Sequence, residues 1–148
     1  MDRFLLALTA LIASVFLVAP AHAQGYFEPY EAENSINLEA GDILIDSTKR
    51  KLYFAYDDEL LIVYPVAVGR EGAGWTGSAT IERMVDGPTW HPTVDQKKKR
   101  RLPDVVPPGP NNPLGEYALY LYQNGRDTLI RIHGTNNPSS IGKAVSDG

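Results

Sequence analysis

The 148-residue sequence contains no cysteine. Disulfide bonds are therefore excluded, and stability has to come from burial of apolar side chains and pairing of the backbone. Neither sign of charge dominates, because 14 basic and 18 acidic residues leave a net charge of −4. This mild acidity gives no reason to expect a nucleic-acid partner, and an apolar content of 43% argues against disorder.

The N-terminal segment lacks the length of a typical membrane span. Its apolar run extends only from Phe4 to Val18, with Arg3 before it and the small-residue triplet AHA at positions 21–23 after it. This order is typical of a secretory signal peptide. We therefore expect residues 1–23 to be removed. The protein would then reside in a bacterial periplasm or cell envelope, with no membrane span after cleavage.

The rest of the chain predicts one domain. Residues 24–37 are polar with interspersed aromatic side chains, which favours a loosely packed leader or linker. Residues 38–148 are long enough to form one packed core. No internal repeat divides them.

Short apolar runs separated by turn residues predict a mainly β domain. Three runs rich in β-branched and aromatic residues are joined by the polar segments DSTKR and DDE, which indicates a meander with tight hairpins. A fourth strand follows a glycine-rich loop, GREGAGWTG, that we interpret as a flexible flap near a cleft. The four predicted strands are Ile43–Ile45, Leu52–Tyr56, Leu61–Val68 and Ser78–Val85.

The segment YALYLYQNGRDTLIRIHG carries the strongest hairpin signal, because Asn124 and Gly125 separate two apolar runs. Two short helices are also predicted. Residues 94–104 form the first and are ended by a proline, and residues 139–146 form the second, capped by Ser139 or Ser140. Many short strands with few helices predict a β-sandwich.

His133 is the principal candidate for a functional side chain. It ends a predicted strand, so its backbone is fixed while its ring can face a cleft. Gly134 permits close approach of another chain or a ligand, and Asn136 and Asn137 can brace the turn. Small-residue turns beside a histidine can also supply backbone N–H groups to an oxyanion. A structural histidine tied to a backbone carbonyl is the alternative, which the residues alone favour.

Other polar residues are weaker candidates. His91 could line a cleft with Trp90 as its wall, or it could be a loop histidine beside a core tryptophan. A zinc site from His91, His133 and Asp86 would suit a metallopeptidase, but no ligand spacing typical of such sites is present. The basic run KKKRR at 97–101 could touch anionic wall polymers, although a solvated helix face is the more ordinary interpretation.

The segments VVPPGPNNPLGEYALYL and IHGTNNPSSIGKAVSDG resemble the catalytic domain of the L,D-transpeptidases, the YkuD-type enzymes of peptidoglycan cross-linking. The resemblance extends from about Asp42 to Gly148 and includes ILIDSTKRKLYFAYDDELLIVYPVAVGR. It implies a β-sandwich of that catalytic type, no cofactor, and peptidoglycan stem peptides as substrate and partner. The predicted export agrees with it, because peptidoglycan lies outside the inner membrane.

The resemblance also implies a reaction. A cysteine thiolate of the family attacks a diaminopimelate carbonyl in a tetrapeptide stem and expels D-alanine, and an acceptor amine then takes the acyl group. By this resemblance His133 is the general base. Gly134, Ser146 and Gly148 are the implied oxyanion and substrate-binding positions.

The family's cysteine would directly follow Gly148, in a pattern whose usual form is Ser-His-Gly-Cys, and Asp147 replaces the histidine. We therefore expect a C-terminally truncated, catalytically incomplete acyltransferase. Ser146 is a poor substitute because it precedes the glycine and because a hydroxyl needs much stronger activation. Missing C-terminal strands would leave this chain marginally stable or prone to aggregation. The alternative is a non-catalytic module that binds peptidoglycan with the same cleft.

Overall fold

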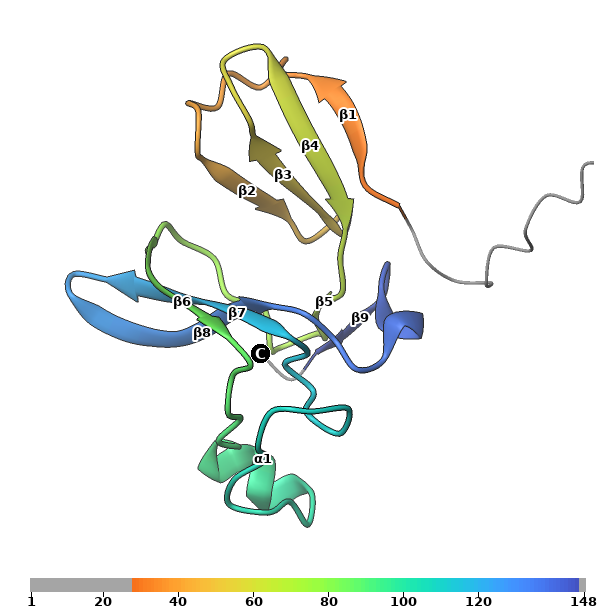
Figure 1. Cartoon of the computed structure of the whole chain (residues 1–148), viewed down its shortest axis with the longest axis vertical. Helices are drawn as coiled ribbons and strands as arrows, with labels where there is room; N and C mark the ends of the chain where they lie inside the picture. The colour runs from red at the N-terminus through yellow and green to blue at the C-terminus, as the bar shows by residue number, and fades with distance from the viewer. Residues whose placement is uncertain (1–27, 147–148) are drawn as a thin grey trace, which may run out of the picture.

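The computed structural model describes residues 28–146, which form a mainly β protein (Figure 1). The described part holds nine short strands, one α-helix and one 3₁₀ turn, so the mainly β prediction is confirmed. The expected signal peptide, Asp147 and Gly148 lie outside the described residues. Within residues 28–146, every helix is too short to cross a membrane.

A four-stranded antiparallel sheet forms the upper part of the molecule in Figure 1. Its order is β1-β4-β3-β2, from strands β1 Tyr30–Glu33, β2 Ile43–Asp46, β3 Lys51–Ala55 and β4 Leu60–Pro65. The predicted three-strand meander is thus confirmed. β1 comes from the segment that we expected to be a leader, and it pairs along β4 with Tyr30 opposite Val63.

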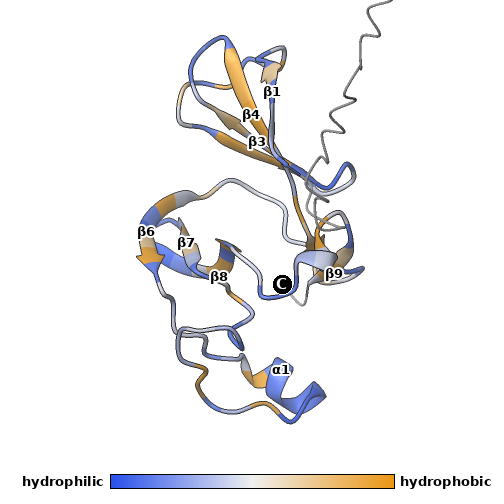
Figure 2. Ribbon diagram, turned by 45° about the vertical axis from the view of Figure 1, so that its right-hand side comes forward, coloured by the Kyte–Doolittle hydropathy of each residue, from blue (hydrophilic) through white to orange (hydrophobic). Residues whose placement is uncertain are grey.

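The core of this sheet is small and consists of Ala55, Leu61 and Val63, which are at most 2% exposed. Figure 2 shows the matching apolar stretches on β3 and β4. The buried amide of Asn34 closes the loop after β1, because it donates to the Leu38 carbonyl (2.7 Å) and accepts from the Leu38 N–H (3.1 Å). The loop therefore satisfies its backbone without a strand partner.

A three-stranded antiparallel sheet of order β6-β7-β8 carries the predicted hairpin. Its strands are β6 Thr80–Asp86, β7 Tyr117–Gln123 and β8 Arg126–His133. Asn124 and Gly125 form the turn with φ values of 53° and 71°. Two left-handed residues in succession fit a type I′ turn, whose twist matches that of the strands. The hairpin prediction is therefore confirmed.

The predicted helix over residues 139–146 is wrong. Pro138–Ser140 form a single 3₁₀ turn, and Ala144–Ser146 form strand β9, which pairs in parallel with β5 Val68–Gly69. The residue that precedes the turn is Asn137, without a side-chain capping bond. The Gly142 N–H donates to the Val66 carbonyl (3.1 Å). Such long-range backbone bonds outweigh the local helix propensity on which the prediction depended.

Two other predicted boundaries differ from the structure. The run Leu61–Val68 is divided between β4 and β5, because Pro65 has no N–H for the ladder and ends β4. The helix predicted over 94–104 is shorter. α1 Val94–Lys99 begins at a capping box between Thr93 and Gln96 and stops before the proline.

Strand β8 contains a bulge that determines which residue lies at its far end. Asp127 lies opposite Tyr122, whereas Arg131 lies opposite Tyr120, so β8 is longer than β7 across this interval. Beyond the bulge, His133 lies opposite Ala118. In a regular ladder continued from Asp127, Arg131 would occupy that position. The bulge therefore brings the histidine to the end of the sheet.

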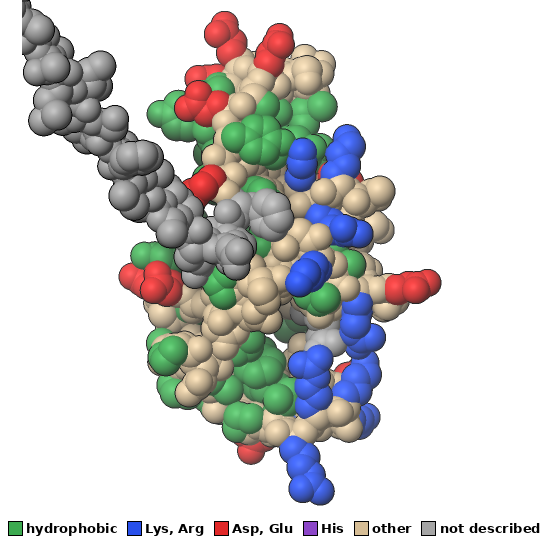
Figure 3. Space-filling model, turned by 90° about the vertical axis from the view of Figure 1, so that its right-hand side faces the viewer, with side chains coloured by type: hydrophobic (Ala, Val, Ile, Leu, Met, Phe, Trp, Pro, Cys, Tyr) green, Lys and Arg blue, Asp and Glu red, His purple; other side chains and the backbone are tan. Residues whose placement is uncertain are grey.

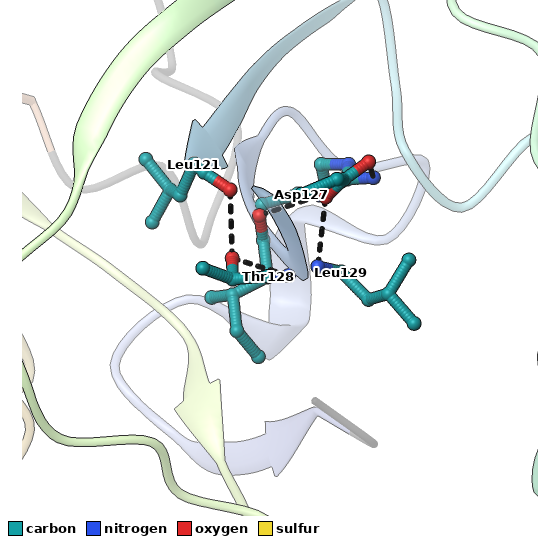
Figure 4. Close-up of polar contacts among 6 residues, drawn as sticks. Leu121, Asp127, Thr128 and Leu129 are labelled. Atoms are coloured by element: carbon teal, nitrogen blue, oxygen red, sulfur yellow. Dashed lines mark hydrogen bonds and ion pairs between the residues drawn. The ribbon is translucent and has the colours of Figure 1, made fainter. Parts of the chain in front are cut away.

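Hydrogen bonds hold the bulge in place (Figure 4). Thr128 Oγ1 donates to the Leu121 carbonyl (2.8 Å) and accepts from the Ile130 N–H (3.1 Å). Asp127 accepts from the Leu129 N–H (2.8 Å). Leu129 has a φ of 63°, a left-handed conformation that costs a residue with a side chain about 1–2 kcal/mol. The contacts of Thr128 and Asp127 offset this cost.

Thr128→Val keeps the shape of the side chain and removes both hydrogen bonds of the hydroxyl. We expect the free energy of unfolding to fall by about 1–2 kcal/mol, measured by urea denaturation. Thr80→Val, at an exposed position on β6, is the matched control and should change it by less than about 0.5 kcal/mol. Equal losses in the two variants would show that the hydroxyl does not stabilise the bulge.

Candidate functional site

His133 ends β8, and its ring is held by the residue that follows. Nδ1 lies 2.6 Å from the carbonyl oxygen of Gly134. A carbonyl can only accept a hydrogen bond, so Nδ1 carries the proton and Nε2 keeps its lone pair. The two roles considered for this histidine are thus compatible. The ring is tied to a backbone carbonyl, and the tie leaves the other nitrogen ready to accept a proton.

The surroundings of His133 favour the neutral imidazole. Desolvation by nearby protein atoms lowers the pKa of the ring below its ordinary value, and hydrogen bonds with the backbone of Gly134 and Leu114 oppose this effect without cancelling it. The residue as a whole is nevertheless exposed to solvent. At neutral pH the ring is therefore uncharged and accessible, which is the state a general base requires.

A proline-rich loop between α1 and β7 supports the His133 turn, and Asn112 holds this loop together. Asn112 is fully buried. Its amide donates to the carbonyls of Pro88 (2.7 Å), Pro107 (3.2 Å) and Val106 (3.3 Å), and its oxygen accepts from the Leu114 N–H (2.9 Å). Asn112 was not among the residues predicted from the sequence. The available signal was an asparagine in a loop whose prolines leave many carbonyls and few donors.

The supporting loop meets the His133 turn backbone to backbone. A Cβ on Gly115 would lie 2.5 Å from the nitrogen of Thr135, and Gly115 has a φ of 68°. A Cβ on Gly134 would lie 3.3 Å from the Leu114 carbonyl oxygen. Gly115 therefore requires glycine for both space and conformation, whereas a side chain on Gly134 would fit only if its neighbours shifted by a few tenths of an ångström.

The backbone of Gly134 takes part in the sheet. Its N–H donates to the Tyr117 carbonyl (3.0 Å) and continues the β7–β8 ladder. Its carbonyl orients His133, and its lack of a side chain leaves space for Leu114. Its expected contribution to an oxyanion or substrate site stays a prediction.

An open cavity of about 570 Å³ adjoins the turn after His133. Thr135 and Asn136 line it. Two carboxylates also line it, from Asp86 at the end of β6 and from Glu116 just before β7. Asn136 also donates to the Pro110 carbonyl (3.2 Å), which ties the turn to the supporting loop. The cavity is large enough for part of a peptide.

The remaining candidates are dispersed. Ser146 ends β9 opposite Gly69, and its carbonyl accepts from the Arg70 N–H (3.0 Å), while Gly148 lies outside the described residues. His91 is exposed, and its neighbour Trp90 forms a β-bridge with Val106. In the described part of the chain, no group of three potential metal ligands comes together, so the zinc interpretation gains no support.

Comparison with known proteins decides the family. Residues 40–148 match the YkuD family, the L,D-transpeptidase catalytic domain. This chain belongs to that family. Over 116 residues it is 41% identical to "Probable L,D-transpeptidase YbiS" of Escherichia coli K12, and over 108 residues it is 38% identical to "Probable L,D-transpeptidase ErfK/SrfK" of the same strain. The matches cover 72% and 67% of this chain.

The same matches cover only 36% and 33% of the two Escherichia coli proteins, so the chain spans about a third of their length. A solved structure from Brucella melitensis, named "Probable carnitine operon oxidoreductase caia", is also similar. It superposes with a TM-score of 0.66 at 37% identity, covering 74% of this chain and 70% of that one. The arrangement of strands in this family domain is therefore shared with an experimental structure.

Asn112→Ala should loosen the loop that supports His133. The carbonyls of Pro88 and Pro107 and the Leu114 N–H lose their partner, while the Val106 carbonyl keeps the Trp90 N–H. We therefore expect a loss of about 2–4 kcal/mol in the free energy of unfolding, measured by urea denaturation. Asn111→Ala, at an exposed position next to it, is the matched control. A loss below about 1 kcal/mol for Asn112→Ala would contradict the bracing role.

The pKa of His133 should be measurable by NMR titration of its ring protons, and we expect it below the ordinary value of about 6.5. A depressed histidine pKa means that the unfolded chain binds the proton more readily. The contribution to stability is therefore complete above about pH 6.5 and decreases as the pH falls through the folded pKa. A midpoint above 6.5 would show that desolvation does not dominate.

Proposed function

We propose that this chain forms the substrate-binding and acid–base part of an L,D-transpeptidase that acts on peptidoglycan stem peptides. The observation that carries the proposal is the ring of His133, whose Nδ1 donates to the Gly134 carbonyl and whose pKa is lowered by desolvation. In that tautomer Nε2 carries the lone pair that can accept a proton. Membership of the L,D-transpeptidase family supplies the reaction class. The cavity beside Thr135 supplies room for a peptide.

In the proposed reaction, Nε2 of His133 removes the proton of a thiol, and the thiolate attacks the diaminopimelate carbonyl of a tetrapeptide stem. D-alanine leaves with the proton from the imidazolium, and a thioester remains. An acceptor amine then attacks the thioester, gives its proton to the imidazole, and releases the thiol. Backbone N–H groups near Ser146 and Gly148 would hold the oxyanion.

The thiol has to come from outside these 148 residues, because they contain no cysteine. A second candidate function is a non-catalytic module that binds stem peptides in the same cavity. The two candidates share the binding step and differ only in acyl transfer. Under both, the protein acts outside the cytoplasm, in the periplasm or cell envelope, as the signal-like residues 1–23 suggest.

A chimera tests the proposal. The chain is continued directly after Gly148 by a cysteine and the following segment of the Escherichia coli relative YbiS. We expect a carbapenem to acylate this chimera, detected by mass spectrometry, and serine in place of the added cysteine to abolish the adduct. His133→Ala should slow acylation by about 100-fold or more, because the general base is lost.

His91→Ala, at an exposed loop histidine, is the matched control and should acylate at the unchanged rate. Acylation that is insensitive to His133→Ala would show that the base is assigned wrongly. A folded chimera that binds a tetrapeptide stem but never acylates would favour the binding module.

A further inference from the structure

A second cavity, of about 540 Å³, lies at the turn between β2 and β3. Lys49, Arg50 and Lys51 line it together with Tyr30 and Pro65. It shares no lining residue with the cavity beside His133. The L,D-transpeptidase reaction proposed above makes no use of it.

A tight turn directs the three cations into this cavity. Asp46 accepts from the Lys49 N–H (2.8 Å), and Arg50 adopts a left-handed conformation with a φ of 56°. The turn therefore presents three successive basic side chains over a short stretch of backbone. These like charges repel one another, so the turn concentrates positive potential at the cavity.

Neighbouring groups fix two of the three cations. Arg50 donates to the Gly142 carbonyl (3.2 Å), and Lys51 Nζ donates to the Tyr30 hydroxyl (2.7 Å) while lying 5.3 Å from the centre of its ring. The bond to Tyr30 also raises the pKa of Lys51, so the ammonium is charged at any physiological pH. Both side chains are thus held in position before a ligand arrives, which reduces the entropy cost of binding.

The charge of the cavity remains positive after its acidic neighbours are counted. Glu28 lines the cavity, and Asp46 approaches Lys49 to 3.4 Å. Two carboxylates therefore face three cations. Figure 3 shows Lys and Arg side chains gathered along one side of the molecule, although the whole chain has a net charge of −4. The local excess of positive charge favours an anionic ligand.

We propose that this cavity binds a carboxylate of a peptidoglycan stem peptide other than the stem that reaches His133. The inference rests on the proposed function, which places the protein on a polymer with many such stems. The guanidinium of Arg50 and the ammonium of Lys49 bind the carboxylate, and the ring of Tyr30 and Pro65 contact an adjacent methyl group. The cavity thereby anchors the domain on the polymer while the His133 site works on a neighbouring stem.

The test measures cosedimentation of the whole chain with purified peptidoglycan sacculi over a range of salt concentrations. Lys49→Gln combined with Lys51→Gln should weaken binding roughly tenfold and reduce its salt dependence, since the Lys49 contact with the carboxylate and the neighbouring positive charge of Lys51 are both lost. Lys98→Gln combined with Lys99→Gln removes the same charge from α1 and should leave binding within about twofold of the wild type. Equal weakening by both pairs would overturn the proposal, because general charge would then account for the binding.

Two further arms identify the ligand. Glycan strands freed of their stems by an amidase should retain little protein, and vesicles of phosphatidylglycerol and phosphatidylethanolamine should not compete with sacculi. Equal retention on stem-free glycan, or binding to the vesicles alone, would overturn the proposal in favour of the sugar backbone or of lipid phosphate. Lys49→Glu, at an exposed position that no core contact requires, provides a single variant that should fold and bind even more weakly.

Failure of this inference is distinct from failure of the proposed function. The sacculus assay needs no cysteine and no turnover. Perturbation of the His133 ring signals by a free tetrapeptide stem reports the first cavity alone. If sacculi are bound through Lys49 and Lys51 while the free stem leaves His133 unperturbed, the anchoring site stands and the transpeptidase proposal fails. The converse result overturns the anchoring site only.

Discussion

The backbone contact between Gly115 and Gly134 is the constraint on which the candidate site depends. A methyl group on Gly115 would overlap the backbone of the His133 turn, and one on Gly134 would press against the Leu114 carbonyl, because the supporting loop crosses the turn at van der Waals distance. Asn112 holds the loop in the shape that permits this approach. As a result the backbone of Leu114 reaches the imidazole, and protein atoms rather than water surround much of the ring. The same contact therefore sets both the orientation and the basicity of His133.

The bulge in β8 supplies the second requirement, which is the correct residue at the end of the strand. Its extra residues shift the register so that His133 lies opposite Ala118. Thr128 and Asp127 stabilise the bulge through local hydrogen bonds. Leu129 has a strained backbone, which fits a bulge whose role is to place His133 at the end of the strand. Sheet register and loop packing thus act together on one side chain.

The sequence predicted those parts of the fold whose signals are local. Alternating apolar runs gave the meander, and Asn124-Gly125 gave the hairpin of the His133 sheet. The family followed from the motifs around His133. Two predictions about the strands were wrong. β9 was predicted as a helix because its partner, Val68, is distant in the sequence. The run Leu61–Val68 was predicted as one strand, although Pro65 cannot make the ladder bond that would continue it. Asn112 was missed because its partners become neighbours only when the loop is folded.

The parallel pairing of β5 with β9 has a consequence for the order in which the molecule assembles. Val68 and Ala144 are partners that lie far apart in the sequence, so their contact closes a long loop. Loop closure of that length slows folding and places such contacts after the local hairpins. The segment that carries Ser146 should therefore become ordered last. Until it does, the folding chain would hold a finished β7–β8 hairpin while β5 remains unpaired, a state from which aggregation or proteolysis can remove it.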